Sequence, residues 1–158
     1  MIKKNIMLLF TFIVIIISYN HILNEKNKIN DSISFEVNTS LPIITAILNG
    51  VEGRFLLDTG ASISILNYES IDDYNFIVFP YSNKTVTGLG GSKYLFDVTK
   101  TQMMYNNKII PINFKCTDIT NLSNTLNIIG VIGSDFLIVN DLVIDYKNKI
   151  LRKSGTFD

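Results

Sequence analysis

Hydrophobic residues beyond residue 34 fall into many short runs separated by turn residues. The run at 43–48 ends in Asn49-Gly50, a pair typical of two-residue hairpin turns, and apolar residues resume at 54–57. Further strand-like runs occupy residues 35–38, 76–79, 84–87, 94–99, 103–105, 109–114, 127–132, 142–146 and 150–152. Short strands at this spacing predict an all-β sandwich or barrel.

The turn residues between these runs predict two further hairpins. Asn106-Asn107 lies at the centre of a hairpin over 103–114, and Lys147-Asn148 lies at the centre of another over 142–152. Only residues 67–74 and 134–139 have a helical pattern, and in the second segment Ser134 is suited to cap one or two turns. Helices are therefore expected to be few and short.

The N-terminus has a different pattern. Lys3 and Lys4 precede an uncharged apolar run at 6–19, the arrangement of a segment that directs export or membrane anchoring. The run is short for a membrane span of about 20 residues, and extending it to residue 23 gives a marginal one. A cleaved signal peptide and an uncleaved signal anchor both remain open, and a buried core helix is disfavoured because the run has no polar face.

We favour an anchor because no small-x-small cleavage pattern follows the run. Residues 1–23 would then be the anchor, with the two lysines in the cytoplasm and the rest of the chain facing outward, or secreted if the segment is cleaved. Residues 24–34 are polar and charged and predict a linker. The folded domain is expected over residues 35–158.

Composition removes several classes of function. Lys and Arg together number 14, as do Asp and Glu, so the basic surplus needed for nucleic-acid binding is missing. Cys116 and His21 are the only cysteine and histidine, which excludes an internal disulfide, a Cys/His zinc site and catalysis by a Ser-His-Asp or Cys-His group. We expect no metal or cofactor, and Cys116 should be buried. An enzyme of this composition would transfer protons with carboxylates or lysines.

One segment has the pattern of a chemical site. In FLLDTGASISIL, at residues 55–66, Asp58 directly follows an apolar strand and directly precedes a Thr59-Gly60 turn. Its apolar neighbours predict a largely desolvated carboxylate unless hydrogen bonds compensate. The tripeptide alone is a weak signal, since Asp-x-Gly also occurs in ordinary hairpin turns.

Two other segments strengthen the signal. LLDTGAS at 56–62, VTGLGG at 86–91 and IIGVIGSDFL at 128–137 together resemble the retropepsin-like aspartic proteases, the family of retroviral proteases and their cellular and bacterial single-domain relatives. The resemblance spans residues 43–151. It implies a closed acid-protease β-barrel with a flap hairpin and one or two short helices, preceded here by the N-terminal hydrophobic helix.

The resemblance also implies roles for particular residues. Asp58 would be catalytic, with active-site turn support from Thr59, Gly60 and Ala61. The flap over bound peptide would contain Gly88, Leu89, Gly90 and Gly91, and the wall of the substrate pocket would contain Val131, Ile132 and Gly133.

In this family two Asp-Thr/Ser-Gly turns meet and their carboxylates share one proton. The ionised carboxylate activates water, and the protonated one hydrogen-bonds the scissile carbonyl. This chain has one such tripeptide, so the resemblance implies a homodimer that contributes Asp58 twice.

The chain departs from the retroviral pattern at two positions. Retroviral members have an Arg after the Gly of the third segment and an acidic residue just after Asp-Thr-Gly-Ala, and the two form an ion pair. Here these positions are Ser134 and Ser62, with Asp135 available instead. The departures point to the bacterial relatives and leave open whether dimerisation or activity is affected.

Three functions compete. The first is an anchored or exported aspartic endopeptidase that cleaves a peptide or protein substrate held extended under the flap. The second is a catalytically inactive peptide-binding module on the same fold. The third is a structural β-domain in which Asp58 only caps a turn, and we favour the first.

Overall fold

The computed structural model describes residues 13–20, 32–88 and 91–155. The chain divides into two units, Met1–Ser32 and Ile33–Asp158. In the first unit residues 13–20 are helical with exposed side chains, and the rest of the expected anchor lies outside the described residues. No helix in the described part of the chain is long and apolar enough to cross a membrane.

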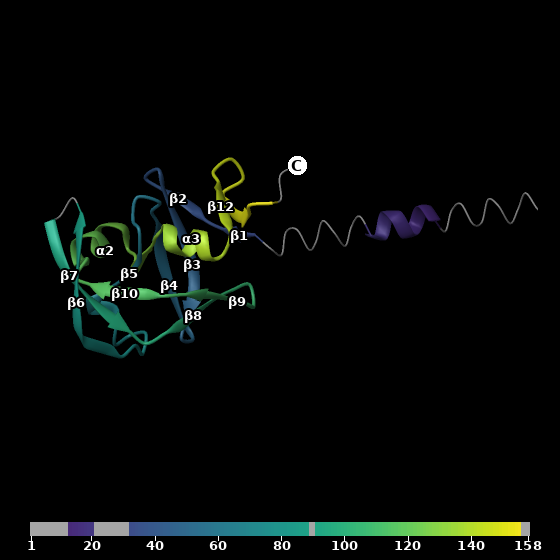
Figure 1. The fold of residues 1–158 in the computed structure, drawn as a ribbon. Coiled ribbons are helices and arrows are strands. Elements are labelled where there is room, and N and C mark those ends of the chain that lie inside the picture. Colours follow the sequence, from purple (N-terminus) through teal and green to yellow (C-terminus); the bar gives the residue numbers. More distant parts are fainter. Residues whose placement is uncertain (1–12, 21–31, 89–90, 156–158) are drawn as a thin grey trace, which may run out of the picture. The chain divides into compact units, whose positions relative to one another are not determined.

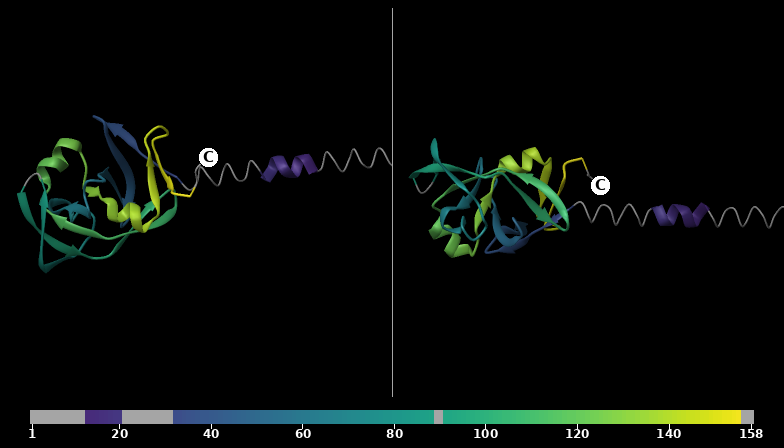
Figure 2. Two further views of the ribbon diagram at one scale, coloured as in Figure 1. Left: turned by 45° about the horizontal axis from the view of Figure 1, so that its top comes forward. Right: turned by 90° about the horizontal axis from the view of Figure 1, so that it is seen from below.

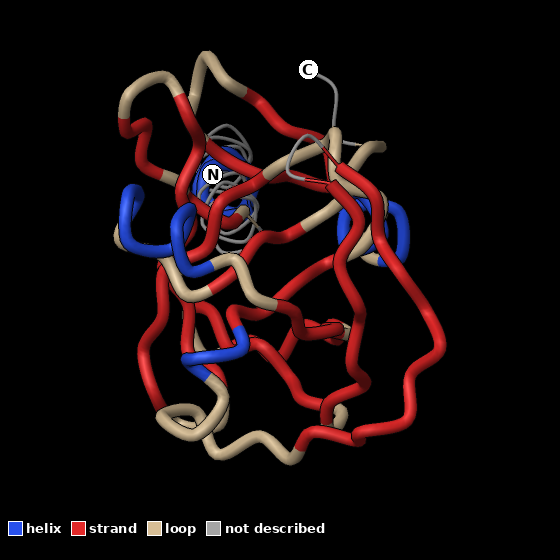
Figure 3. Tube along the Cα trace, turned by 90° about the vertical axis from the view of Figure 1, so that its left-hand side faces the viewer, coloured by secondary structure: helices blue, strands red, loops and turns tan. Residues whose placement is uncertain are grey.

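The second unit consists mainly of strands (Figure 1). The strands are β1 Ile33–Ser34, β2 Glu36–Asn38, β3 Leu41–Leu48, β4 Val51–Leu57, β5 Ser64–Asn67, β6 Val78–Gly88, β7 Gly91–Val98, β8 Thr101–Tyr105, β9 Lys108–Ile112, β10 Phe114–Thr117, β11 Gly130–Ile132, β12 Leu142–Asp145 and β13 Ile150–Lys153. The helical segments are the 3-10 helix η1 Tyr68–Ser70, α2 Thr120–Leu126 and α3 Ser134–Val139. Figure 3 shows these short helical segments set between long stretches of strand.

The strands form two sheets. The larger has the order β6-β7-β10-β5-β11-β4-β3-β8-β9, with β2 also paired to β3, and the smaller has the order β1-β13-β12. The order of the larger sheet ends at β6 and β9, so the closed barrel that we expected is not found in the described part of the chain. Both end strands contain a proline, Pro80 and Pro111, which has no amide hydrogen and suits a strand at the edge of a sheet.

All three hairpins predicted from turn residues are present. β3 pairs with β4 around Asn49-Gly50, β8 pairs with β9 around Asn106-Asn107, and β12 pairs with β13. Both residues of each of the first two turns have a left-handed backbone, as such turns require. For example, φ is 86° at Gly50 and 60° at Asn107. The β12–β13 hairpin and the β6–β7 hairpin lie at opposite ends of the domain (Figure 2).

The helices differ from the prediction in two places. The expected helix at 67–74 is reduced to η1, whereas the expected helix at 134–139 is confirmed as α3. Residues 120–126 were not expected to be helical but form α2, which ends at Asn127 with φ 52°. Leu126 packs into an apolar cluster beneath this helix, so tertiary contact rather than helix propensity accounts for α2.

The main core lies between the strands. Phe55 of β4 and Phe114 of β10 stack with ring centroids 5.8 Å apart, and both are buried. Ile132 of β11 and Cys116 of β10 are completely buried in the same cluster, which confirms the expected burial of the lone cysteine. Burial raises the pKa of the Cys116 thiol to about 11, with a smaller contribution from the charge of Asp97.

Candidate active site

The strand order places Asp58 at the end of two parallel strands. β11 lies between β4 and β5 and is parallel to β4, so the carboxyl ends of β4 and β11 meet at one edge of the sheet. Asp58 directly follows β4, and its amide donates to the carbonyl of Ile132, the last residue of β11, over 3.0 Å. The chain from Asp58 to Ile63 then passes over the end of β11 to reach β5.

The Asp58 carboxylate folds back onto its own turn. Asp58 Oδ1 accepts a hydrogen bond of 2.8 Å from the Gly60 amide. The backbone carbonyl of Asp58 accepts one of 3.1 Å from the Ala61 amide. A Cβ at position 60 would lie 3.1 Å from Asp58 Oδ1, so glycine leaves the carboxylate room to take this position. Asp58, Thr59 and Gly60 are exposed in the single chain, although the apolar flanks had predicted a desolvated carboxylate.

The start of α3 packs against the same turn. The Ser134 amide and hydroxyl both donate to the Ala61 carbonyl, over 2.8 and 3.1 Å. A Cβ on Gly133 would lie 2.7 Å from the backbone carbonyl of Ile63, so only glycine permits this approach. Ser134 thus holds the turn by hydrogen bonds at the position where the retroviral pattern has an arginine.

Ser64 and Asp135 make a second connection between the turn and α3. Asp135 accepts from the Ser64 hydroxyl over 2.7 Å and from the Ser64 amide over 3.1 Å. The Gly133 amide donates to the Ser64 hydroxyl over 3.1 Å. Sequence reasoning noted Asp135 but missed Ser64, because a lone buried serine in a strand gives no local signal.

The predicted pocket-wall residues lie on opposite faces of β11. Val131 is buried in a small apolar cluster that includes Leu56 and Leu126, with Ala61 and Ile119 packed against it. Ile132 is fully buried in the main core. Of the two, Val131 is therefore on the side of the sheet that Ala61 covers.

The predicted flap is a hairpin formed by β6 and β7. Gly88 pairs with Gly91, and Gly91 has φ 91°, a backbone conformation that favours glycine. Leu89 and Gly90, predicted for the flap tip, lie outside the described residues. Near the tip, the hydroxyls of Thr87 and Ser92 are 2.8 Å apart and hydrogen-bonded across the hairpin.

Other carboxylates have local partners. A hydrogen bond from Lys115 holds the pKa of the Asp97 carboxyl below its usual value. A hydrogen bond from the Thr120 amide likewise lowers the pKa of the Asp118 carboxyl, and a hydrogen bond from the Asn148 side chain lowers the pKa of the Asp145 carboxyl. Each of these three carboxylates is therefore bound by a neighbouring side chain or amide away from the Asp58 turn.

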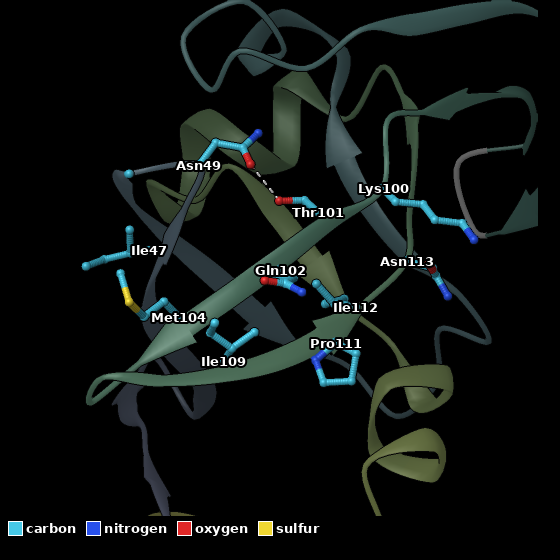
Figure 4. A pocket seen from close by; sticks show the side chains of 11 residues that line it. Ile47, Asn49, Lys100, Thr101, Gln102, Met104, Ile109, Pro111, Ile112 and Asn113 are labelled. Atoms are coloured by element: carbon cyan, nitrogen blue, oxygen red, sulfur yellow. Dashed lines mark hydrogen bonds between the residues drawn. The ribbon is translucent and has the colours of Figure 1, made fainter.

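The structure also has a hollow away from this turn. It has a volume of about 600 Å³ and is formed by β3, β8, β9 and the loops beside them (Figure 4). Its lining is mixed, with Met104 and Ile109 beside Asn49, Gln102 and Lys100. No residue of the Asp58 turn, of β11 or of the described flap lines it.

Comparison with known proteins agrees with this geometry. Residues 44–136, more than half of the chain, match the aspartyl protease family. The chain belongs to this family. A search of curated proteins finds no match to this chain.

Solved structures show the same fold. The EIAV protease complexed with the inhibitor HBY-793 is 20% identical, with a TM-score of 0.51 over 64% of this chain and 88% of the viral one. A retropepsin-like aspartic protease from Rickettsia conorii is 19% identical, with a TM-score of 0.51 over 76% and 86% of the two chains. The retroviral protease-like domain of Ddi1 from Leishmania major is 18% identical, with a TM-score of 0.55 over 75% and 91%. The fold of this chain is therefore retropepsin-like, as the three sequence segments predicted.

Proposed function

We propose that this chain is an aspartic endopeptidase that works as a homodimer, with Asp58 of each copy at one shared active site. The observation that carries the proposal is the position of the only Asp-Thr-Gly of the chain. It is exposed at the sheet edge where β4 and β11 end, in a domain of the aspartyl protease family. A carboxylate in this position can face its copy across a two-fold axis.

The chemistry follows from bringing two carboxylates together. Two such groups a few Å apart do not both ionise, so they share one proton. The ionised carboxylate takes a proton from water as the water oxygen attacks the scissile carbonyl carbon. The protonated carboxyl hydrogen-bonds the carbonyl oxygen and stabilises the tetrahedral intermediate, and a proton passes to the amine as the C–N bond breaks. The Gly60 amide on Asp58 Oδ1 fixes the direction of each carboxylate.

The substrate in this proposal is an extended peptide segment. The β6–β7 hairpin would cover it, and the Asp58 turns would lie beneath it. Burial under the hairpin and against the second copy would supply the desolvation of Asp58 that the single chain lacks.

Cleavage of a mixed peptide pool between pH 4 and 7 tests the proposal, with the association state measured in parallel. Asp58→Asn should abolish cleavage and keep the fold and the dimer, since an amide oxygen can still accept from the Gly60 amide. Asp73→Asn, at an exposed acidic residue outside the turn, is the matched control and should cleave like wild type. Cleavage that survives Asp58→Asn would refute the proposal, and a folded dimer that binds peptide without cleaving it would favour the peptide-binding module.

We propose in addition that residues 1–23 anchor the chain in a membrane with the protease domain outside the cytoplasm. The support is the sequence of Lys3 and Lys4 followed by the apolar run at 6–19. Membranes washed with alkaline carbonate should retain the chain, and its mature N-terminus should still contain this run. Release of the chain, or an N-terminus beyond residue 23, would contradict an uncleaved anchor.

A further inference from the structure

Asp135 and Ser64 form a closed set of hydrogen bonds at the start of α3. The two carboxylate oxygens of Asp135 accept from one residue, with Oδ1 2.7 Å from the Ser64 hydroxyl and Oδ2 3.1 Å from the Ser64 amide. The same hydroxyl accepts from the Gly133 amide over 3.1 Å. Ser64 has no exposed surface, and its bond with the Gly133 amide is buried, whereas Asp135 is partly exposed.

These bonds fix one end of the turn that contains Asp58. At the other end, the Asp58 amide is bonded to Ile132 at the end of β11. Between the two ends, the Ala61 carbonyl accepts both donors of Ser134. The turn is thus attached to β11 and α3 at its beginning, its middle and its end, and every one of these contacts lies within one copy of the chain.

The chemistry at position 135 favours a carboxylate over an amide. Ser64 presents two donors, an N–H and an O–H, and a carboxylate offers two acceptor oxygens to match them. Asparagine offers one oxygen and places an NH₂ group against the other donor. A change from Asp to Asn therefore loses at least one bond with almost no change in volume.

We propose that Asp135, acting through Ser64, is a positioning residue that sets the place of the Asp58 carboxylate in each copy before the two copies associate. For its effect on catalysis this inference rests on the proposed function. Asp135 itself does not touch the reacting atoms in this account.

The test compares Asp135→Asn and Ser64→Ala, alone and combined, with the Asp73→Asn control in the 158-residue chain. A misplacement of about 1 Å in an active site can reduce the rate about 100-fold, so we expect kcat to fall roughly tenfold to 100-fold. KM and the dimer mass should stay within about twofold of wild type, because the residues do not contact the substrate. The double variant should lose no more than the worse single variant, since both act on one set of bonds. Ser64→Ala keeps the test valid if Asp135→Asn does not fold.

A second measurement does not depend on catalysis. Amide hydrogen exchange at Ala61 and Ser134 should be at least about tenfold faster in Asp135→Asn than in the control, while exchange in β12 and β13 stays unchanged. Equal exchange rates in Asp135→Asn and in the Asp73→Asn control would overturn the inference. A folded Asp135→Asn dimer with the kcat of wild type would also overturn it, as would a loss of kcat that is explained entirely by unfolded protein. If wild type shows no cleavage that depends on Asp58, the proposed function fails, and the exchange result still decides the positioning role.

Discussion

Replacing Gly133 with alanine tests the close packing of the Asp58 turn on α3. The Cβ of the alanine would lie 2.7 Å from both the carbonyl carbon and oxygen of Ile63, and 2.8 Å from the carbonyl oxygen of Ala61. These are backbone atoms, so rotation of a side chain cannot relieve the overlap. Ordinary contact begins at 3.4 Å, and the turn or α3 would have to move by about 0.7 Å.

The magnitude follows from two opposing effects. Overpacking in a close-packed interior costs about 1–3 kcal/mol. Gly133 has φ −90° and ψ −176°, which alanine adopts without strain. The lower entropy of the unfolded alanine chain therefore offsets about 0.4–1 kcal/mol of the lost unfolding free energy. The expected net loss is about 1.5 kcal/mol of unfolding free energy. For a domain of this size, that lowers the Tm by roughly 6 °C.

Thermal unfolding of the variants beside wild type measures this effect. Gly155→Ala is the matched control, because a Cβ at position 155 meets nothing within 4 Å. We expect a lower Tm for Gly133→Ala only, together with a lower kcat, since the Ile63 and Ala61 backbone displaced by the methyl group belongs to the Asp58 turn. A Gly133→Ala variant that melts within about 1 °C of the control would refute the packing described here.

Two other residues give independent predictions. The free energy of unfolding should fall by at most about 3 kcal/mol as the pH rises from 9 through 11, because the pKa of the Cys116 thiol is about 11 in the folded state and 9.0 in the unfolded state. Urea unfolding across this pH range measures the slope. A Cys116→Ala variant with the same slope would contradict the assignment. Tyr74→Phe should cost about 1 kcal/mol, because the Tyr74 hydroxyl donates to the Glu52 carbonyl over 2.7 Å at a partly buried site; an unchanged urea midpoint would show that this bond contributes nothing.

Local patterns account for what the sequence could predict. Asn49-Gly50 and Asn106-Asn107 specify tight turns by their tolerance of a left-handed backbone, so both hairpins follow from neighbouring residues. The Asp58 turn gave only a weak local signal, and it became recognisable because the segments at 86–91 and 128–137 resemble the same family.

Long-range packing accounts for the features that the sequence could not predict. Ser64 and Asp135 are 71 residues apart, and neither has a neighbour that indicates the other. The insertion of β11 between β4 and β5 brings them together, and no periodicity within one strand encodes that order. In the same way α2 depends on the contact of Leu126 with a distant apolar cluster, and the predicted closed barrel failed because strand patterns do not specify how the two end strands, β6 and β9, are placed.

The activity of mixed dimers tests the central claim most directly. Wild-type and Asp58→Asn chains would be combined at constant total concentration and allowed to exchange subunits, with differently tagged chains to verify that mixed dimers form. If each active site needs Asp58 from both copies, activity falls with the square of the wild-type fraction, and about a quarter remains in an equal mixture. A linear decline, with about half of the activity in that mixture, would show that each copy works independently, and about three quarters would show that one Asp58 is enough for a dimer; either result would contradict a site that needs both copies.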